Sequence, residues 1–116
     1  MKKLNFILKI DDLEIINKDC EYYSDENHIR FIYENLKLTV QKKGDVVSFI
    51  RESDEDFLEI CDNNSDLKCI VRLKNPKIKI NLKVEKFLYK FEHNKVKIKY
   101  IIESDENHEK TIILSL

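Results

Sequence analysis

Apolar and polar side chains alternate along most of this chain, and this period of two restricts the fold more than any other feature. In "KIKINLKVE", residues 77–85, apolar side chains from Ile78 to Val84 alternate with lysines and an asparagine. "KVKIKYIIE", residues 95–103, repeats the pattern. Successive side chains of a strand point to opposite faces, so the pattern predicts strands with one buried and one wet face. Alanine, the strongest helix former, is absent.

Turn-like segments divide the chain into about ten strands. They are expected near residues 2–10, 13–23, 29–33, 36–42, 46–52, 57–61, 67–74, 77–91, 95–102 and 110–116. Short connections favour antiparallel neighbours, and closure removes the two open edges of a long meander. The prediction is a single all-β domain over residues 1–116, a closed antiparallel up-and-down β-barrel of eight to ten strands. With one glycine, Gly44, positive-φ turns must mostly use asparagine and aspartate.

One stretch leaves two alternatives open. In "VEKFLYKFEHNK" the alternation slips after Val84, and Phe87, Leu88 and Phe91 would also suit a helical turn. A bulge in a long strand explains the slip too, and the strands on both sides favour it.

The segment "EYYSDENHIRFIYE", residues 21–34, combines paired tyrosines, a polar turn and an Ile-x-Phe-x-Tyr-Glu strand. It resembles the strand–turn–strand signature of the uncharacterised bacterial YwiB-like family. Arg51 at a strand end and the late "KVKIKYIIES" fit the same layout. The resemblance implies a calycin-type, lipocalin-like closed barrel over the whole chain, and it implies no activity.

The motif SDENH occurs twice, at Ser24–His28 and Ser104–His108, with a partial copy at Ser53–Asp56. Carboxylates and histidine are metal ligands, but adjacent acids on an extended backbone point apart. We therefore expect solvated hairpin turns, with a metal site as the lesser alternative. Ten strands would place the two full copies at opposite barrel ends. Division of residues 77–91 into two antiparallel strands would bring them to one end.

Charge is strongly segregated although the net charge is only −1. Residues 11–66 contain 16 acidic and 6 basic residues, whereas residues 67–99 contain 2 acidic and 11 basic ones. Lysines on the wet side of two late strands predict an outer face for a polyanion or a protein partner. The candidates are Lys77, Lys79, Lys83, Lys95, Lys97 and Lys99. No aromatic partner is expected on this face, and the alternative is a solubilising surface that guards against edge pairing.

The barrel interior is a second candidate site, for a small apolar ligand. Its candidate residues are Tyr22, Phe31, Tyr33, Phe49, Arg51 and Phe57. A filled core is favoured over a cavity because Ile and Leu are abundant. Arg51, if buried, would need a carboxylate partner or would mark the mouth of a pocket.

Catalytic and cofactor motifs are not found in the sequence, so we expect a non-catalytic protein with no metal and no cofactor; a metal-dependent enzyme is the least favoured alternative. The three cysteines, Cys20, Cys61 and Cys69, lack zinc or disulfide spacing and predict buried thiols in a reducing compartment. The N-terminus lacks a signal-peptide cleavage site, and no apolar run could span a bilayer. The expected location is cytoplasmic. The sequence does not specify an oligomeric state.

Overall fold

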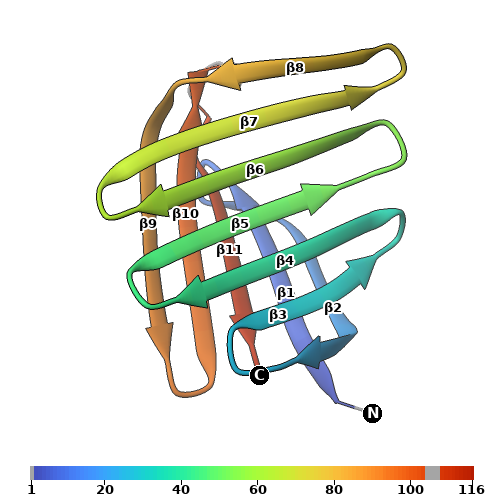
Figure 1. Ribbon diagram of the computed structural model, residues 1–116. Coiled ribbons are helices and arrows are strands. Elements are labelled where there is room, and N and C mark those ends of the chain that lie inside the picture. The colour runs from blue at the N-terminus through green and yellow to red at the C-terminus, as the bar shows by residue number, and fades with distance from the viewer. Residues whose placement is uncertain (1, 104–107) are drawn as a thin grey trace. The chain divides into compact units, whose positions relative to one another are not determined.

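The computed structural model describes residues 2–103 and 108–116, which form eleven strands and no α-helix (Figure 1). The strands are β1 (Lys3–Ile10), β2 (Leu13–Ser24), β3 (His28–Tyr33), β4 (Leu36–Lys43), β5 (Val46–Glu52), β6 (Asp56–Asn63), β7 (Asp66–Lys74), β8 (Lys77–Leu82), β9 (Val84–Glu92), β10 (Lys95–Ile102) and β11 (Lys110–Ser115). Every pair of hydrogen-bonded neighbours is antiparallel. The prediction of an all-β, antiparallel fold is confirmed, but the predicted number of eight to ten strands was wrong, because the described residues form eleven.

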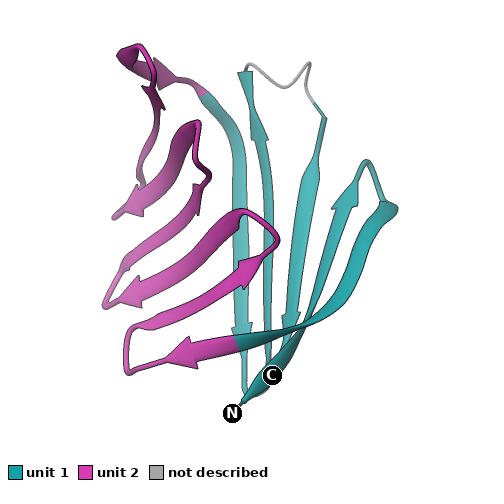
Figure 2. Cartoon of the chain, turned by 90° about the vertical axis from the view of Figure 1, so that its right-hand side faces the viewer, with its two compact units in different colours: residues 1–21, 84–116 teal, residues 22–83 magenta. Residues whose placement is uncertain are grey.

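The strands belong to two compact units, coloured separately in Figure 2. Unit 1 contains Met1–Glu21 and Val84–Leu116, and unit 2 contains Tyr22–Lys83. Strand β2 contributes its first part to unit 1 and its last three residues to unit 2. Each unit is described by itself below.

Unit 1 has the strand order β2-β1-β11-β10-β9, with the last strand of the chain in the middle. In β11, Leu114 lies opposite Phe6 of β1 and Val96 of β10, and all three side chains are buried. The next residue toward the N-terminus, Ile113, lies on the other face opposite Lys97. The alternation read from the sequence therefore separates a core face from a lysine-bearing face in this unit.

The ambiguous stretch at residues 85–92 is a strand with a bulge. In the β9–β10 ladder Lys86 pairs with Ile101 and Val84 pairs with Ile102, which leaves Glu85 as the extra residue. A bulge shifts the phase of alternation by one position, which accounts for the slip after Val84. The bulge interpretation is confirmed, and the helical alternative was wrong.

Unit 2 is a meander in which the end of β2 and β3 to β8 follow one another in chain order. Its buried face is continuous from strand to strand. Facing positions in the ladders carry Phe31 and Leu38, Val40 and Phe49, and Ile60 and Cys69. Such apolar cross-strand pairs stabilise an antiparallel sheet.

The predicted single strand over residues 77–91 was wrong, because the chain changes its partner within it. Strand β8 pairs with β7 up to Leu82, and β9 begins at Val84 in the other unit. No Gly or Pro marks Lys83, so the alternation runs through the division. The same prediction assigned Ile78 and Ile80 to a core face, yet these side chains are 45% and 39% exposed.

The hairpin turns explain how the chain manages with one glycine. Asp11 and Asp12 both have positive φ, and so do Asn64 and Ser65. Two consecutive positive-φ residues form the turn type whose twist matches that of antiparallel strands. Asparagine and aspartate fill three of these four positions, as expected.

Candidate anion-binding surface

One face of β6, β7 and β8 in unit 2 carries a row of side chains that combines an aromatic ring with cations. Phe57 of β6 lies opposite Arg72 of β7, which in turn lies opposite Lys79 of β8. One row nearer the β7–β8 turn, Lys74 lies opposite Lys77. Because side chains two residues apart share a face, all five lie on the same side of the sheet.

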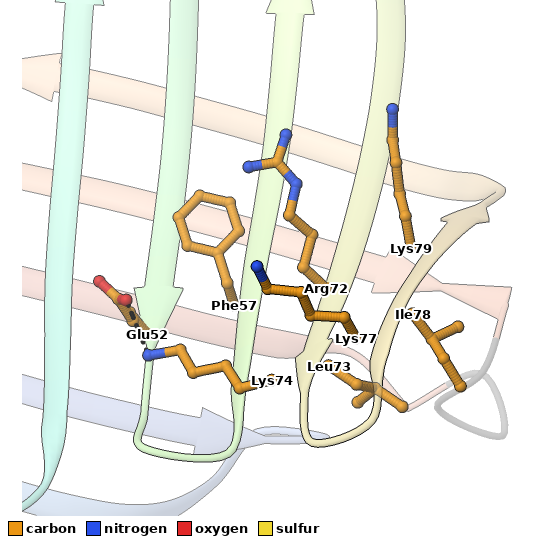
Figure 3. A pocket seen from close by; sticks show the side chains of 8 residues that line it. All are labelled: Glu52, Phe57, Arg72, Leu73, Lys74, Lys77, Ile78 and Lys79. Carbon is orange, nitrogen blue, oxygen red and sulfur yellow. Dashed lines mark hydrogen bonds and ion pairs between the residues drawn. The ribbon is translucent and has the colours of Figure 1, made fainter.

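These side chains line a groove of about 600 Å³ near the β7–β8 turn (Figure 3). The lining residues are Glu52, Phe57, Arg72, Leu73, Lys74, Lys77, Ile78 and Lys79. This volume lies in the range of pockets that hold small organic ligands. The groove lies wholly within unit 2.

The charges in the groove are only partly compensated. Lys74 Nζ donates to Glu52 Oε2 at 2.9 Å and to the Ser53 carbonyl at 2.8 Å, and the first bond appears as a dashed line in Figure 3. The hydrogen bond from Lys74 is the main reason that the pKa of Glu52 lies below its usual value. In the described part of the chain, no carboxylate lies within ion-pair distance of Arg72, Lys77 or Lys79. Three cations are therefore available to an anionic ligand.

An aromatic ring supports one of these cations. The guanidinium carbon of Arg72 lies 5.4 Å from the centroid of the Phe57 ring, a cation–π geometry. A ring contact of this kind restricts the motion of the guanidinium and leaves its N–H groups able to bind an anion. The expectation that this face has no aromatic partner was wrong.

Phe57 therefore does not lie with the other predicted interior residues. Its neighbour Leu58 is buried opposite Arg51, whereas Phe57 is half-buried opposite Arg72. The remaining candidates share the buried face of unit 2: Tyr22, Phe31, Tyr33, Phe49 and Arg51. Phe31 and Phe49 are buried, and Tyr22 and Tyr33 are half-buried.

Arg51 is half-buried, and it has a carboxylate partner of the kind expected for a buried arginine. Its Nη2 lies 3.8 Å from Asp56 Oδ2, and its side chain is 32% exposed. Asp56 also accepts a hydrogen bond from the Ser53 hydroxyl at 2.9 Å. The partial SDED motif is thus a turn that positions the counterion of Arg51.

The six predicted lysines divide between the units. Lys77, Lys79 and Lys83 belong to unit 2. The other three, Lys95, Lys97 and Lys99, belong to unit 1 and follow one face of β10. Lys99 lies 3.8 Å from Glu109, which also accepts a hydrogen bond from Lys86 at 2.7 Å. The hydrogen bond from Lys86 is the main reason that the pKa of Glu109 is lowered.

The first SDENH motif forms the turn between β2 and β3, and the side chain of Asp25 organises it. The Asp25 carboxylate accepts hydrogen bonds from the backbone N–H groups of Asn27 and His28, at 2.8 and 2.9 Å, and it bonds His28 Nδ1 at 3.0 Å. The N–H of Asn27 is the largest cause of the lowered pKa of Asp25. These bonds show that Asp25 stabilises the turn between the two strands.

Most of the second SDENH motif, Ser104–Asn107, lies outside the described residues. Its last residue, His108, bonds the carboxylate of Asp11, which also accepts the N–H of Glu109 at 2.9 Å. The bond to His108 is the main reason that the pKa of Asp11 is lowered. Over residues 2–103 and 108–116, no three His, Cys, Asp or Glu side chains gather as metal ligands do.

Four carboxylates among the described residues have lowered pKa values and should lose their contacts in acid. They are Asp11, Asp25, Glu52 and Glu109, and the pKa of each is lower in the folded than in the unfolded protein. Their contribution to the stability of the fold is therefore complete at a pH above the unfolded pKa values, near 4. It is lost as the pH falls through the lowered values. We expect the melting temperature to drop as the pH is lowered below about 4. The Asp11→Asn/Asp25→Asn variant should show a shallower drop in a calorimetric pH series, and an equally steep one would contradict the assignment.

The cysteines are all free thiols. Cys20 and Cys69 are buried as predicted, but Cys61 is only half-buried. Burial, with a smaller contribution from the negative charge of Asp19, raises the pKa of the Cys20 thiol. Among the described residues no helix has the length and apolar character needed to cross a membrane.

Comparison with known proteins finds one structural likeness. The crystal structure of the ywiB protein from Bacillus subtilis matches with a TM-score of 0.50 and 10% sequence identity, over 97% of this chain and 86% of that chain. No family model and no curated protein matches the sequence. At this identity the likeness concerns the fold alone, and at that level it supports the resemblance seen in the sequence.

Proposed function

We propose that this chain is a non-catalytic binding module that holds an anionic partner on the groove of β6–β8. One observation carries the proposal: Arg72, Lys77 and Lys79 line the same groove, and no described carboxylate lies within ion-pair distance of them. Like charges so placed repel one another, and an anion relieves that repulsion. A purely solubilising surface gains nothing from gathering cations in a concavity.

The composition of the groove also favours an anion over a neutral ligand. Arg72 is held by the ring of Phe57, so little side-chain freedom is lost when its N–H groups bind a carboxylate or phosphate. Lys74 is already anchored to Glu52 and fixes the β5–β6 turn beside the groove. Binding that depends on such cations weakens steeply as salt is added.

The proposal also includes the type of barrel and the location of the protein. The up-and-down strand order and the likeness to the ywiB protein support a barrel of the lipocalin or calycin type that is left open at β8 and β9, the two ends of the strand order. The three free thiols support a reducing, cytoplasmic location. An apolar ligand carried inside such a barrel is the alternative function, but Phe31 and Phe49 are buried as core residues are, and no observation favours it.

Charge reversal tests the proposal, with heparin as the polyanionic probe. The Lys77→Glu/Lys79→Glu variant should elute from a heparin column at much lower salt than the original protein. The slope of log K against log salt should fall by roughly 1.5 to 2, because two contacts are lost. Both lysines are exposed, so the fold should be retained and a thermal melt should show it.

The matched control reverses two lysines of unit 1. Lys95→Glu/Lys97→Glu changes the net charge by the same amount on a face of β10. The salt concentration at which this control elutes should change by only a small fraction of the change seen for the groove variant. Equal shifts for the two variants would show that heparin binding depends on total charge and not on the groove. Unchanged retention of the groove variant would contradict the proposal.

A further inference from the structure

Strand β8 lies at the end of the strand order and is open to an additional neighbour. In the described part of the chain it is hydrogen-bonded to β7 alone. All its residues from Lys77 to Asn81 are exposed, and only Leu82 is half-buried. A strand with one free edge presents backbone N–H and C=O groups that can pair with an extended peptide.

The two faces of this edge differ sharply in chemistry. On one face, the rows Arg72–Lys79 and Lys74–Lys77 are cationic. On the other, Ile78 pairs with Leu73 and Ile80 pairs with Val71, and both isoleucines are exposed. A strand added beside β8 would place alternate side chains against each face.

We propose that β8 takes up an extended acidic segment of a partner protein as an added strand. Acidic side chains at every second position would lie beside Lys77 and Lys79, and apolar ones between them would cover Ile78 and Ile80. The charge recognition rests on the proposed anion-binding function, whereas the backbone pairing and the apolar contacts go beyond it. Opposite charges and apolar pairs across neighbouring strands are both stabilising.

Charge decides against a second copy of this chain as the occupant. Two β8 edges placed side by side would bring the cationic rows of both copies together, and like charges on facing strands are destabilising. Lysine on an edge strand prevents self-association for this reason. The same lysines attract an acidic strand. A nucleic acid could satisfy the cations but would leave the exposed isoleucines and the free backbone edge uncovered.

Two synthetic peptides of identical composition test the inference. One alternates glutamate and valine over eight residues, and the other places the four glutamates together before the four valines. Isothermal titration at low salt should show that the full chain binds the alternating peptide at least about tenfold more tightly. Amide hydrogen exchange of β8 should slow only with the alternating peptide. Equal affinity for both peptides would overturn strand addition while leaving anion binding intact.

A variant and a second probe separate the two proposals. Ile80→Thr changes a residue outside the groove lining and keeps every charge and the β-branched side chain, so heparin retention should persist while the preference for the alternating peptide falls several-fold. Heparin binding without either peptide binding would overturn the acidic-strand partner alone. Tighter binding of a single-stranded oligonucleotide of equal charge would overturn it in favour of nucleic acid. If the original protein bound neither heparin nor either peptide, both proposals would be wrong.

Discussion

Replacement of Leu114 by aspartate is expected to leave the chain largely unfolded. Leu114 is fully buried in β11, the middle strand of unit 1, between Phe6 and Val96. An ionised carboxylate at this position would lose its hydration without gaining a partner, at a cost of several kcal/mol. That cost is comparable with the total stability of an ordinary domain, about 5–15 kcal/mol. Circular dichroism and thermal unfolding should show little cooperative transition.

The neighbouring residue gives a matched control. Ile113 lies on the opposite face of β11, half-buried and opposite Lys97. Ile113→Asp introduces the same charge beside a lysine and should remain folded, with a melting temperature lowered by only a few degrees. Two variants that unfold equally would show that the alternation of faces assigned to β11 is wrong.

Replacement of Phe49 by alanine should destabilise the protein by about 3–5 kcal/mol, the usual cost of removing a buried aromatic side chain. Phe49 is 1% exposed and lies opposite Val40 and Ile60 in the centre of the unit 2 sheet. The resulting cavity can collapse only in part, because its neighbours belong to hydrogen-bonded strands. The free energy of unfolding in urea measures the loss.

Phe57→Ala is the control for this change and has a second readout. Phe57 is half-buried on the opposite face beneath Arg72, so its removal should cost about 1 kcal/mol of stability. It should also weaken heparin retention, because Arg72 loses its support. Phe49→Ala, assayed where it is folded, should leave heparin retention unchanged. The reverse pattern would contradict the placement of the two rings.

Alternation was sufficient to predict the fold class and most strand boundaries. Leu36, Leu38 and Val40, for example, alternate cleanly, and all lie on one face of β4. Alternation reports which face of a strand is buried but not which strand it pairs with. The sequence through Lys83 therefore reads as one strand, although β8 and β9 pair with different neighbours. Alternation also does not show which strand lies at the edge of a sheet, and for this reason Ile78 was predicted to lie in a core.

The site was predicted in part. The charge count pointed to Lys77 and Lys79, but Phe57 was assigned to the interior because it is aromatic. In "FLEIC", Phe57 shares its phase with Glu59, whereas Leu58 shares its phase with Ile60. Glu59 was the signal that the face carrying Phe57 is exposed to water. The cation–π contact with Arg72 depends on the register between β6 and β7, which no local pattern contains.

The central position of β11 has a consequence for the order in which the protein assembles. Unit 2 is one continuous segment whose strands pair with their chain neighbours, so its contacts span short loops and can form early. Unit 1 needs Asn5 to meet Ser115 across nearly the whole chain. During synthesis β1 and the first part of β2 must therefore wait as a lone hairpin, which is at best marginally stable in water. Completion of unit 1 therefore has to wait until β11 has left the ribosome.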